Sequence, residues 1–123
     1  MSAPVVYVID DDTALRTAYA SALHKLGLEV ETGTDGLEAK ELVQKATPDI
    51  MLLDMLMPNM DGLTFLHYLR EHAKYDDVLV VVASNFPTMP ELDGLRVSKF
   101  LPKQKHTPEQ VAEAVAEIVK AKV

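Results

Sequence analysis

Residues 49–62 read DIMLLDMLMPNMDG, and the start of this stretch decides the fold. The four apolar residues Ile50 to Leu53 form a continuous run that ends at Asp54. Such runs are typical of strands buried on both faces, as in a parallel sheet. Two further runs share the pattern, Val5 to Ile9 and Val78 to Ala83, and two weaker strands are expected at Leu28 to Thr32 and Lys99 to Leu101.

Amphipathic helical patterns separate these runs. Apolar residues fall on one helical face between the first two strands, and again after Gly36, after Asp61 and after Thr107. Asp61 is a candidate N-cap, and Thr107 to Gln110 predict a capping box with proline at the first helical position. The alternation predicts an α/β fold, a doubly wound five-stranded parallel sheet flanked by helices on both faces.

One unit of this alternation is irregular. Between Ser84 and Ser98 the chain carries Pro87, Pro90 and Gly94. Proline inside a helix removes a hydrogen bond and clashes with the preceding turn. The fourth helix is therefore expected to be short or irregular, with one or two turns after Pro90.

Length and composition narrow the class of protein. The 123 residues suit one domain, residues 1–123, and the chain contains no cysteine, which excludes disulfides and thiolate metal sites. A net charge of -7 disfavours direct binding of nucleic acid, because phosphate backbones require a basic surface. The apolar runs are too short to span a membrane and no signal peptide is apparent, so membrane insertion is not expected and a cytoplasmic location is.

Charged and hydroxyl side chains stand where the predicted strands end. Asp10 and Asp11 follow the first strand, Asp54 follows the third, Ser84 the fourth and Lys103 the fifth. In an open parallel sheet these ends lie together and form the usual ligand site. Clustered carboxylates repel one another, and a divalent cation with oxygen ligands, Mg2+ or Mn2+, offsets that repulsion best.

These residue types suit phosphoryl transfer to a carboxylate. Asp54 is the candidate nucleophile, and Lys103 and the metal would neutralise charge on the phosphoryl oxygens. Asp12 is expected to cap a helix rather than bind metal. His24, His67, His72 and His106 show no ligand spacing and are expected on the surface.

Four stretches in order resemble the signatures of one family, the receiver domains of response regulators in two-component signalling. They are VIDDDTALR at 8–16, DIMLLDMLMPNMDG at 49–62, VVVAS at 80–84 and FLPK at 100–103. The resemblance spans the whole chain and implies a flavodoxin-like receiver fold. The run from Asp54 to Gly62 is the most specific of the four.

The resemblance also implies a role for each matching residue. Asp54 corresponds to the phosphorylated residue, and Lys103 to the lysine that contacts the phosphate. Asp11 corresponds to a direct ligand of Mg2+, Asp10 to a ligand that acts mainly through water, and the backbone carbonyl of Leu56 to a further ligand.

Further positions match the residues that respond to phosphorylation in the family. Ser84 corresponds to the switch hydroxyl that moves toward the phosphoryl group, and Phe100 to an aromatic rotamer switch. Leu56 and Phe86 occupy the two positions that tune the lifetime of the phosphate. Because both are apolar, we expect them to shield the acyl phosphate from water.

The implied partners are those of two-component signalling. The phosphoryl donor would be a sensor histidine kinase, a histidine phosphotransfer protein or a small phosphodonor. The downstream partner would be another protein or an output domain, and the chain would act alone or as part of a longer regulator. Such a domain catalyses its own phosphorylation and autodephosphorylation but turns over no free substrate.

Two features depart from the family pattern. Gln104 follows the lysine, where the family usually has proline, and the interval from Ser84 to Lys103 is shorter than usual. In the family the fourth helix, the fifth strand and the last helix form the usual output face. An irregular fourth helix would alter that face.

Three other functions compete with this interpretation. A phosphatase of the haloacid-dehalogenase type also uses an aspartate after a first strand, and Asp10 and Asp12 fit its signature, but Ala14 does not. An interaction module that keeps the fold without phosphorylation is a second alternative. A flavodoxin-like carrier is disfavoured because no phosphate-binding loop rich in glycine or hydroxyl residues follows the first strand.

Overall fold

A computed structural model describes residues 3–122, and its centre is one sheet of five parallel strands. The strands are β1 Val5–Ile9, β2 Glu29–Gly33, β3 Ile50–Leu53, β4 Leu79–Ser84 and β5 Lys99–Pro102. Their order in the sheet is β2-β1-β3-β4-β5. This is the doubly wound, flavodoxin-like order, in which the direction of winding changes between β1 and β3.

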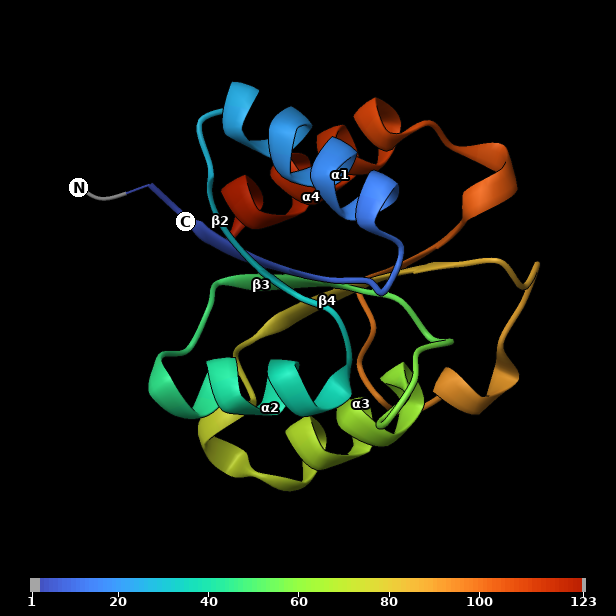
Figure 1. Ribbon diagram of the computed structural model, residues 1–123. Coiled ribbons are helices and arrows are strands. Elements are labelled where there is room, and N and C mark those ends of the chain that lie inside the picture. Colours follow the sequence, from blue (N-terminus) through green and yellow to red (C-terminus); the bar gives the residue numbers. More distant parts are fainter. Residues whose placement is uncertain (1–2, 123) are drawn as a thin grey trace.

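Helices cover both faces of the sheet (Figure 1). The helices are α1 Thr13–Lys25, α2 Gly36–Lys45, α3 Gly62–Glu71 and α4 Pro108–Ala121. Shorter 3-10 turns are η1 Ala73–Tyr75, η2 Pro90–Leu92 and η3 Lys103–Lys105. Helices α1 and α4 lie on one face of the sheet, while α2 and α3 lie on the other. Among the helices of residues 3–122, none has the length and apolarity that crossing a bilayer requires.

The sheet divides the core into two apolar clusters. Successive strand residues point to opposite faces, so Val8 and Leu52 pack toward α1 and α4, whereas Ile9 and Leu53 pack toward α2 and α3. All four side chains are almost completely buried. Burial on both faces explains why the strand sequences are continuously apolar instead of alternating.

Side chains at the helix starts satisfy free backbone N–H groups. Asp12, Asp35 and Asp61 each accept a hydrogen bond from the backbone three residues later, at the starts of α1, α2 and α3. Thr107 and Gln110 form the predicted capping box of α4. The predicted capping roles of Asp12, Asp61 and Thr107 are confirmed.

The predicted fold class is confirmed, but the predictions for β2 and β4 began one residue too early, and those for β2, β4 and β5 ended one residue too early. Leu28 was placed in β2, but its N–H donates to the carbonyl of Leu23 and completes the end of α1. Val78 was placed in β4, but its N–H donates to the carbonyl of Tyr75 and ends the η1 turn. Both residues are apolar and buried, so the sequence pattern could not separate them from the strand that follows.

The fourth unit is short, as predicted. Between β4 and β5 the regular structure is the three-residue turn η2. Arg70 of α3 anchors the chain that follows this turn. Its guanidinium donates to the carbonyls of Leu95 and Arg96, and also to those of Tyr75 and Val78, at 2.9–3.2 Å. One side chain thus binds four backbone carbonyls, two before β4 and two in the segment that leads to β5.

We expect Arg70→Lys to lower the free energy of unfolding by about 1–3 kcal/mol, because a single ammonium cannot reach all four carbonyls. Hydrogen exchange in residues 93–97 should accelerate as well. Urea denaturation and hydrogen exchange measure the two effects. Arg96→Lys is the matched control, since Arg96 forms an ion pair with Asp76 in which both side chains are 55% exposed. That variant should change stability by no more than about 0.5 kcal/mol. Equal effects of the two variants would contradict the anchoring role.

Candidate functional site

Strand register places Asp10 and Asp54 side by side at the carboxyl ends of β1 and β3. Ile9 pairs with Leu53, and the N–H of Asp54 donates to the carbonyl of Ile9 at 2.9 Å. The two aspartates follow these paired residues at the point where the winding of the sheet changes, the usual ligand position in such folds. Both are buried, with exposed fractions of 2% for Asp10 and 5% for Asp54.

Each oxygen of the Asp10 carboxylate has a donor. The N–H of Asp12 donates to Oδ1 and the ammonium of Lys103 donates to Oδ2, both at 2.9 Å. The guanidinium of Arg16, on the first turns of α1, donates to the backbone carbonyl of Asp10 at 2.7 Å. Asp10 is therefore held through its backbone and its side chain.

The Asp54 carboxylate is held through one oxygen only. Oδ1 accepts a hydrogen bond from the N–H of Met55 at 2.9 Å and lies 3.2 Å from the ammonium of Lys103. Oδ2 accepts no hydrogen bond from residues 3–122. Burial, and then the negative charge of Asp10, raise the pKa of Asp54 to about 6, although Lys103 opposes the shift.

Lys103 lies between the two carboxylates. Its ammonium is 2.9 Å from Asp10 and 3.2 Å from Asp54, and its side chain is almost buried. Burial alone would lower its pKa, but the hydrogen bond to Asp10 and the charges of both aspartates outweigh burial and raise the pKa of Lys103. The lysine therefore stays charged. Gln104 follows it where the family that the chain resembles usually has proline, and Lys103 nevertheless contacts both aspartates, so this difference does not displace its ammonium group.

Asp11 completes a group of three carboxylates. Asp10, Asp11 and Asp54 offer one oxygen each, and these oxygens lie within 4.8 Å of one another. Asp11 is exposed, while the other two are buried. An all-oxygen set with one open side suits Mg2+, which retains water and accepts one or two carboxylates. The residues present fit the predicted cation.

Ser84 lies at the end of β4, next to β3, with its side chain buried. Its hydroxyl accepts a hydrogen bond from the N–H of Phe86 at 3.1 Å and points its proton at the sulfur of Met89, 3.8 Å away. In this state the hydroxyl is engaged by its own loop. The η3 turn that contains Lys103 is bonded to the same segment, because the side-chain amide of Gln104 donates to the carbonyl of Asn85 at 2.7 Å.

The other three predicted site residues are apolar and at least partly exposed. Leu56 and Phe86 are exposed large apolar side chains, with exposed fractions of 56% and 41%. Phe100 on β5 is half-buried and packs against the cluster on the α2 and α3 face. It also lines a surface hollow of about 810 Å³ together with residues 87–90.

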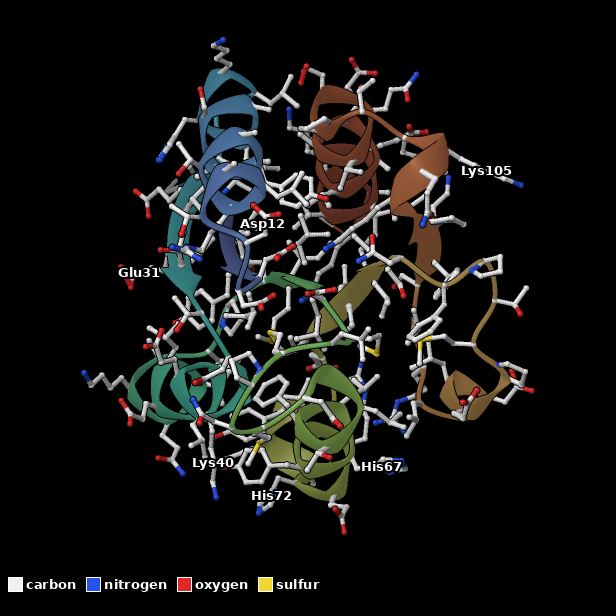
Figure 2. All side chains as sticks on the ribbon, turned by 45° about the vertical axis from the view of Figure 1, so that its right-hand side comes forward. Asp12, Glu31, Lys40, His67, His72 and Lys105 are labelled. Atoms are coloured by element: carbon white, nitrogen blue, oxygen red, sulfur yellow. The ribbon has the colours of Figure 1, made fainter. Side chains whose placement is uncertain are left out.

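Two of the histidines, His67 and His72, lie at the lower edge of Figure 2, away from Asp12, which lies above the middle of this oblique view. His24, His67 and His72 are exposed as predicted. His106 is less exposed than predicted, because it is half-buried and its Nδ1 lies 2.9 Å from the carbonyl of Pro102.

Three supporting contacts could not be identified from the sequence motifs. They are Arg16 on the carbonyl of Asp10, Gln104 on the carbonyl of Asn85, and the amide of Asn59 on the carboxylate of Asp35 at 2.7 Å. Two of the three acceptors are backbone carbonyls, which carry no sequence signal. The position of Arg16 within the first turns of α1 was the one available indication.

Comparisons with known proteins agree on one family. The family model of the response regulator receiver domain matches residues 6–116. A protein-glutamate methylesterase/protein-glutamine glutaminase of Anaeromyxobacter dehalogenans is 45% identical over 82 residues, 67% of this chain and 23% of that protein. The DNA-binding transcriptional regulator NtrC of Escherichia coli is 32% identical over 98% of this chain and 25% of its own length.

Solved structures give the same result for the fold. The chemotaxis response regulator CheY4 of Vibrio cholerae superposes with a TM-score of 0.87 at 26% identity, over 95% of this chain and 99% of that one. A receiver domain of a Francisella response regulator gives 0.86 at 22% identity, over 98% and 99% of the two chains. The chain spans about a quarter to a third of the curated relatives that it matches.

We expect the stability advantage of Asp54→Asn over wild type to grow by about 2.4 kcal/mol between pH 4 and pH 8 in metal-free buffer. A folded-state pKa raised from 3.8 to about 6 means that wild type has its full stability below pH 3.8 and loses it as the pH rises through 6. Asparagine does not titrate, and Lys103 keeps Asp10 as its partner. Urea denaturation at both pH values measures the difference, and a pH-independent difference would contradict the raised pKa.

Proposed function

The chain belongs to the response regulator receiver domain family of two-component signalling, and from this premise we propose that it is a switch that accepts a phosphoryl group on Asp54. The observation that carries the proposal is Oδ2 of that buried carboxylate beside Lys103, which accepts no hydrogen bond within the described residues 3–122. We further propose that residues 1–123 form a single receiver domain.

Receiver domains generally bind Mg2+ at an acidic cluster, and this chain has such a cluster. We assign the ligands to the carboxylates of Asp10, Asp11 and Asp54 and to the backbone carbonyl of Leu56. Mg2+, or Mn2+ in its place, would supply positive charge that neutralises the phosphoryl oxygens during transfer. Because Asp11 is exposed, the cluster is open to an incoming phosphodonor on that side.

The transfer forms one bond and breaks one bond. Oδ2 of Asp54 attacks phosphorus, a P–O bond forms, and the P–N bond of a phosphohistidine breaks, with its electron pair remaining on the leaving imidazole. Lys103 is 3.2 Å from the other oxygen of Asp54, close enough to bind a phosphoryl oxygen after transfer. In autodephosphorylation, water attacks phosphorus, inorganic phosphate leaves and the carboxylate is regenerated.

The response to phosphorylation starts at Ser84. Its hydroxyl is engaged by Phe86 and Met89, so binding the phosphoryl group requires it to leave those partners and to move the start of the β4–β5 loop. The hollow beside Phe100 leaves room for that ring to change rotamer. The added charge thereby selects a second conformation of the surface near β5.

The partners follow from the family and its relatives. We propose a sensor histidine kinase or a histidine phosphotransfer protein as the donor. The curated relatives are several times longer than this chain and include a methylesterase and a DNA-binding regulator. The downstream partner is accordingly another protein or an output domain that responds to the surface near β5.

Intact-mass spectrometry after incubation with acetyl phosphate tests the proposed chemistry. Wild type should gain one phosphoryl group in Mg2+ and none in EDTA, and Asp54→Asn should gain none. Asp12→Asn is the matched control, because Asp12 caps α1 next to the site and asparagine caps a helix equally well. That variant should be labelled like wild type.

Two outcomes would overturn the proposal. Wild type that binds Mg2+ but is never labelled would indicate an interaction module that keeps the fold without phosphorylation. Steady release of phosphate with rapid turnover would indicate a phosphatase.

Leu56→Asn should shorten the lifetime of the phosphorylated protein several-fold. The apolar side chain excludes water next to Asp54, whereas an amide can hydrogen-bond the attacking water. Loss of the phosphoryl mass with time, after removal of the donor, measures the rate. Leu37→Asn is the matched control, because Leu37 is comparably exposed, at 45%, but lies on α2. Equal lifetimes in Leu56→Asn and wild type would contradict the shielding role.

A further inference from the structure

The segment between β3 and α3, residues 55–61, has no regular secondary structure. It begins next to Asp54 and contains Leu56, whose backbone carbonyl is the proposed fourth ligand of the metal. A backbone ligand has no side-chain rotamer to adjust, so its position depends on the conformation of its segment. The contacts that hold residues 55–61 therefore bear on metal binding.

The base of this segment is closed by Gly62. Its N–H donates to the carbonyl of Met55 at 2.9 Å. A Cβ atom at position 62 would lie 2.0 Å from the carbonyl oxygen of Asp54, a distance that the fold cannot accommodate. Only glycine allows the end of the segment to approach the acceptor residue this closely.

The far end of the segment is held by the start of α2. The amide of Asn59 donates to Oδ2 of Asp35 at 2.7 Å, and the N–H of Gly36 donates to the carbonyl of Met60 at 2.8 Å. A Cβ atom at position 36 would lie 2.6 Å from that carbonyl. Two adjacent residues, the N-cap and the first residue of α2, thus bind two adjacent residues of the segment.

Asp35 has two roles, because it caps α2 and also binds Asn59. Asp35 caps α2 through Oδ1, which accepts from the N–H of Glu38 at 2.9 Å, so Oδ2 is left for Asn59. Asp35 is only 6% exposed, and the hydrogen bond from Asn59 lowers its pKa, so the bond is charge-assisted.

Asn59 itself adopts a left-handed backbone conformation with φ 66°. Asparagine tolerates this region better than most residues but less well than glycine. Glycine at position 59 would suit the backbone, yet it would lose the bond to Asp35. The two roles of the residue, backbone and side chain, can therefore be separated by mutation.

We propose that Asp35 and Asn59 are positioning residues for the metal: their hydrogen bond orders residues 55–61 before the metal arrives, so that the Leu56 carbonyl is already in place. The inference rests on the proposed metal site. Without the bond, binding has to order the segment, and that entropic cost appears as weaker affinity.

Binding of Mn2+, followed by the electron paramagnetic resonance signal of the free ion, tests the inference without using phosphorylation. Asn59→Ala and Asn59→Gly should both weaken Mn2+ binding, by roughly tenfold. In metal-free protein, hydrogen exchange at Gly36 should accelerate in both variants. Glu38→Ala is the matched control, because the Glu38 carboxylate caps the same helix through the N–H of Thr34 and does not touch residues 55–61. It should bind Mn2+ like wild type.

Exchanging the side chains of Asp35 and Asn59 tests whether their hydrogen bond can be restored in the opposite direction. Asn59→Asp places two carboxylates against each other and should release the segment, seen as fast exchange at Gly36. Adding Asp35→Asn restores a donor and an acceptor at the same net charge as wild type. The double variant should recover slow exchange and most of the Mn2+ affinity.

Three outcomes would overturn the inference. Wild-type affinity in Asn59→Gly would show that only the backbone conformation matters. Equal weakening in Glu38→Ala would show a general effect of α2 stability. Wild type that binds no Mn2+ would overturn the metal site itself, a result distinguishable from the other two because it precedes any mutation.

Discussion

The ion pairing of Lys103 with Asp10 and Asp54 is the interaction on which the rest of the structure depends. Register forces the two carboxylates into neighbouring buried positions, where they repel each other and raise the pKa of Asp54. One ammonium, held 2.9 Å from one aspartate and 3.2 Å from the other, offsets that repulsion. Lys103 stabilises the two carboxylates but leaves one oxygen available to a ligand, because Oδ2 of Asp54 accepts no hydrogen bond from residues 3–122. A cation would offset the remaining repulsion, because Asp11 brings a third carboxylate to the same cluster and Lys103 pairs with only two of the three.

The loops around this ion pair differ in how firmly they are held. Residues 55–61 are bound at the base by Gly62 and at the far end by Asp35 and Gly36. The β4–β5 segment has one regular turn, and its anchors are Arg70 at one end and the Gln104 amide at the other. Metal binding needs fixed ligands, whereas a switch needs a segment with two arrangements of similar energy. The firmer contacts lie on the side of the proposed metal ligands, and the sparser contacts lie on the side of Ser84.

The sequence predicted the fold and the acidic site because both depend on local patterns. Apolar runs located the strands, and strand ends in a parallel sheet must meet, so Asp10, Asp54 and Lys103 could be grouped across 93 positions of the chain. Helix caps such as Asp61 and Thr107 were predictable because their partners lie three residues away. The residues of the Asp35–Asn59 hydrogen bond are 24 positions apart. Arg70 binds backbone carbonyls, which every residue has, so the sequence does not indicate which carbonyls it contacts. Contacts of this kind depend on tertiary packing and need coordinates.

The chemistry of the site is contained within the fold. Every group that could bind the phosphoryl group or the metal comes from a strand end or from the segment next to it, so no second domain is needed to complete the site. That self-sufficiency explains how one module can match short portions of relatives as different as a methylesterase and a DNA-binding regulator. In the proposed function, the output partner responds to a surface that changes while the metal ligands stay fixed. Because residues 55–61 are held at both ends, we propose that the change propagates through Ser84 and the β4–β5 segment, where a hollow lies beside Phe100.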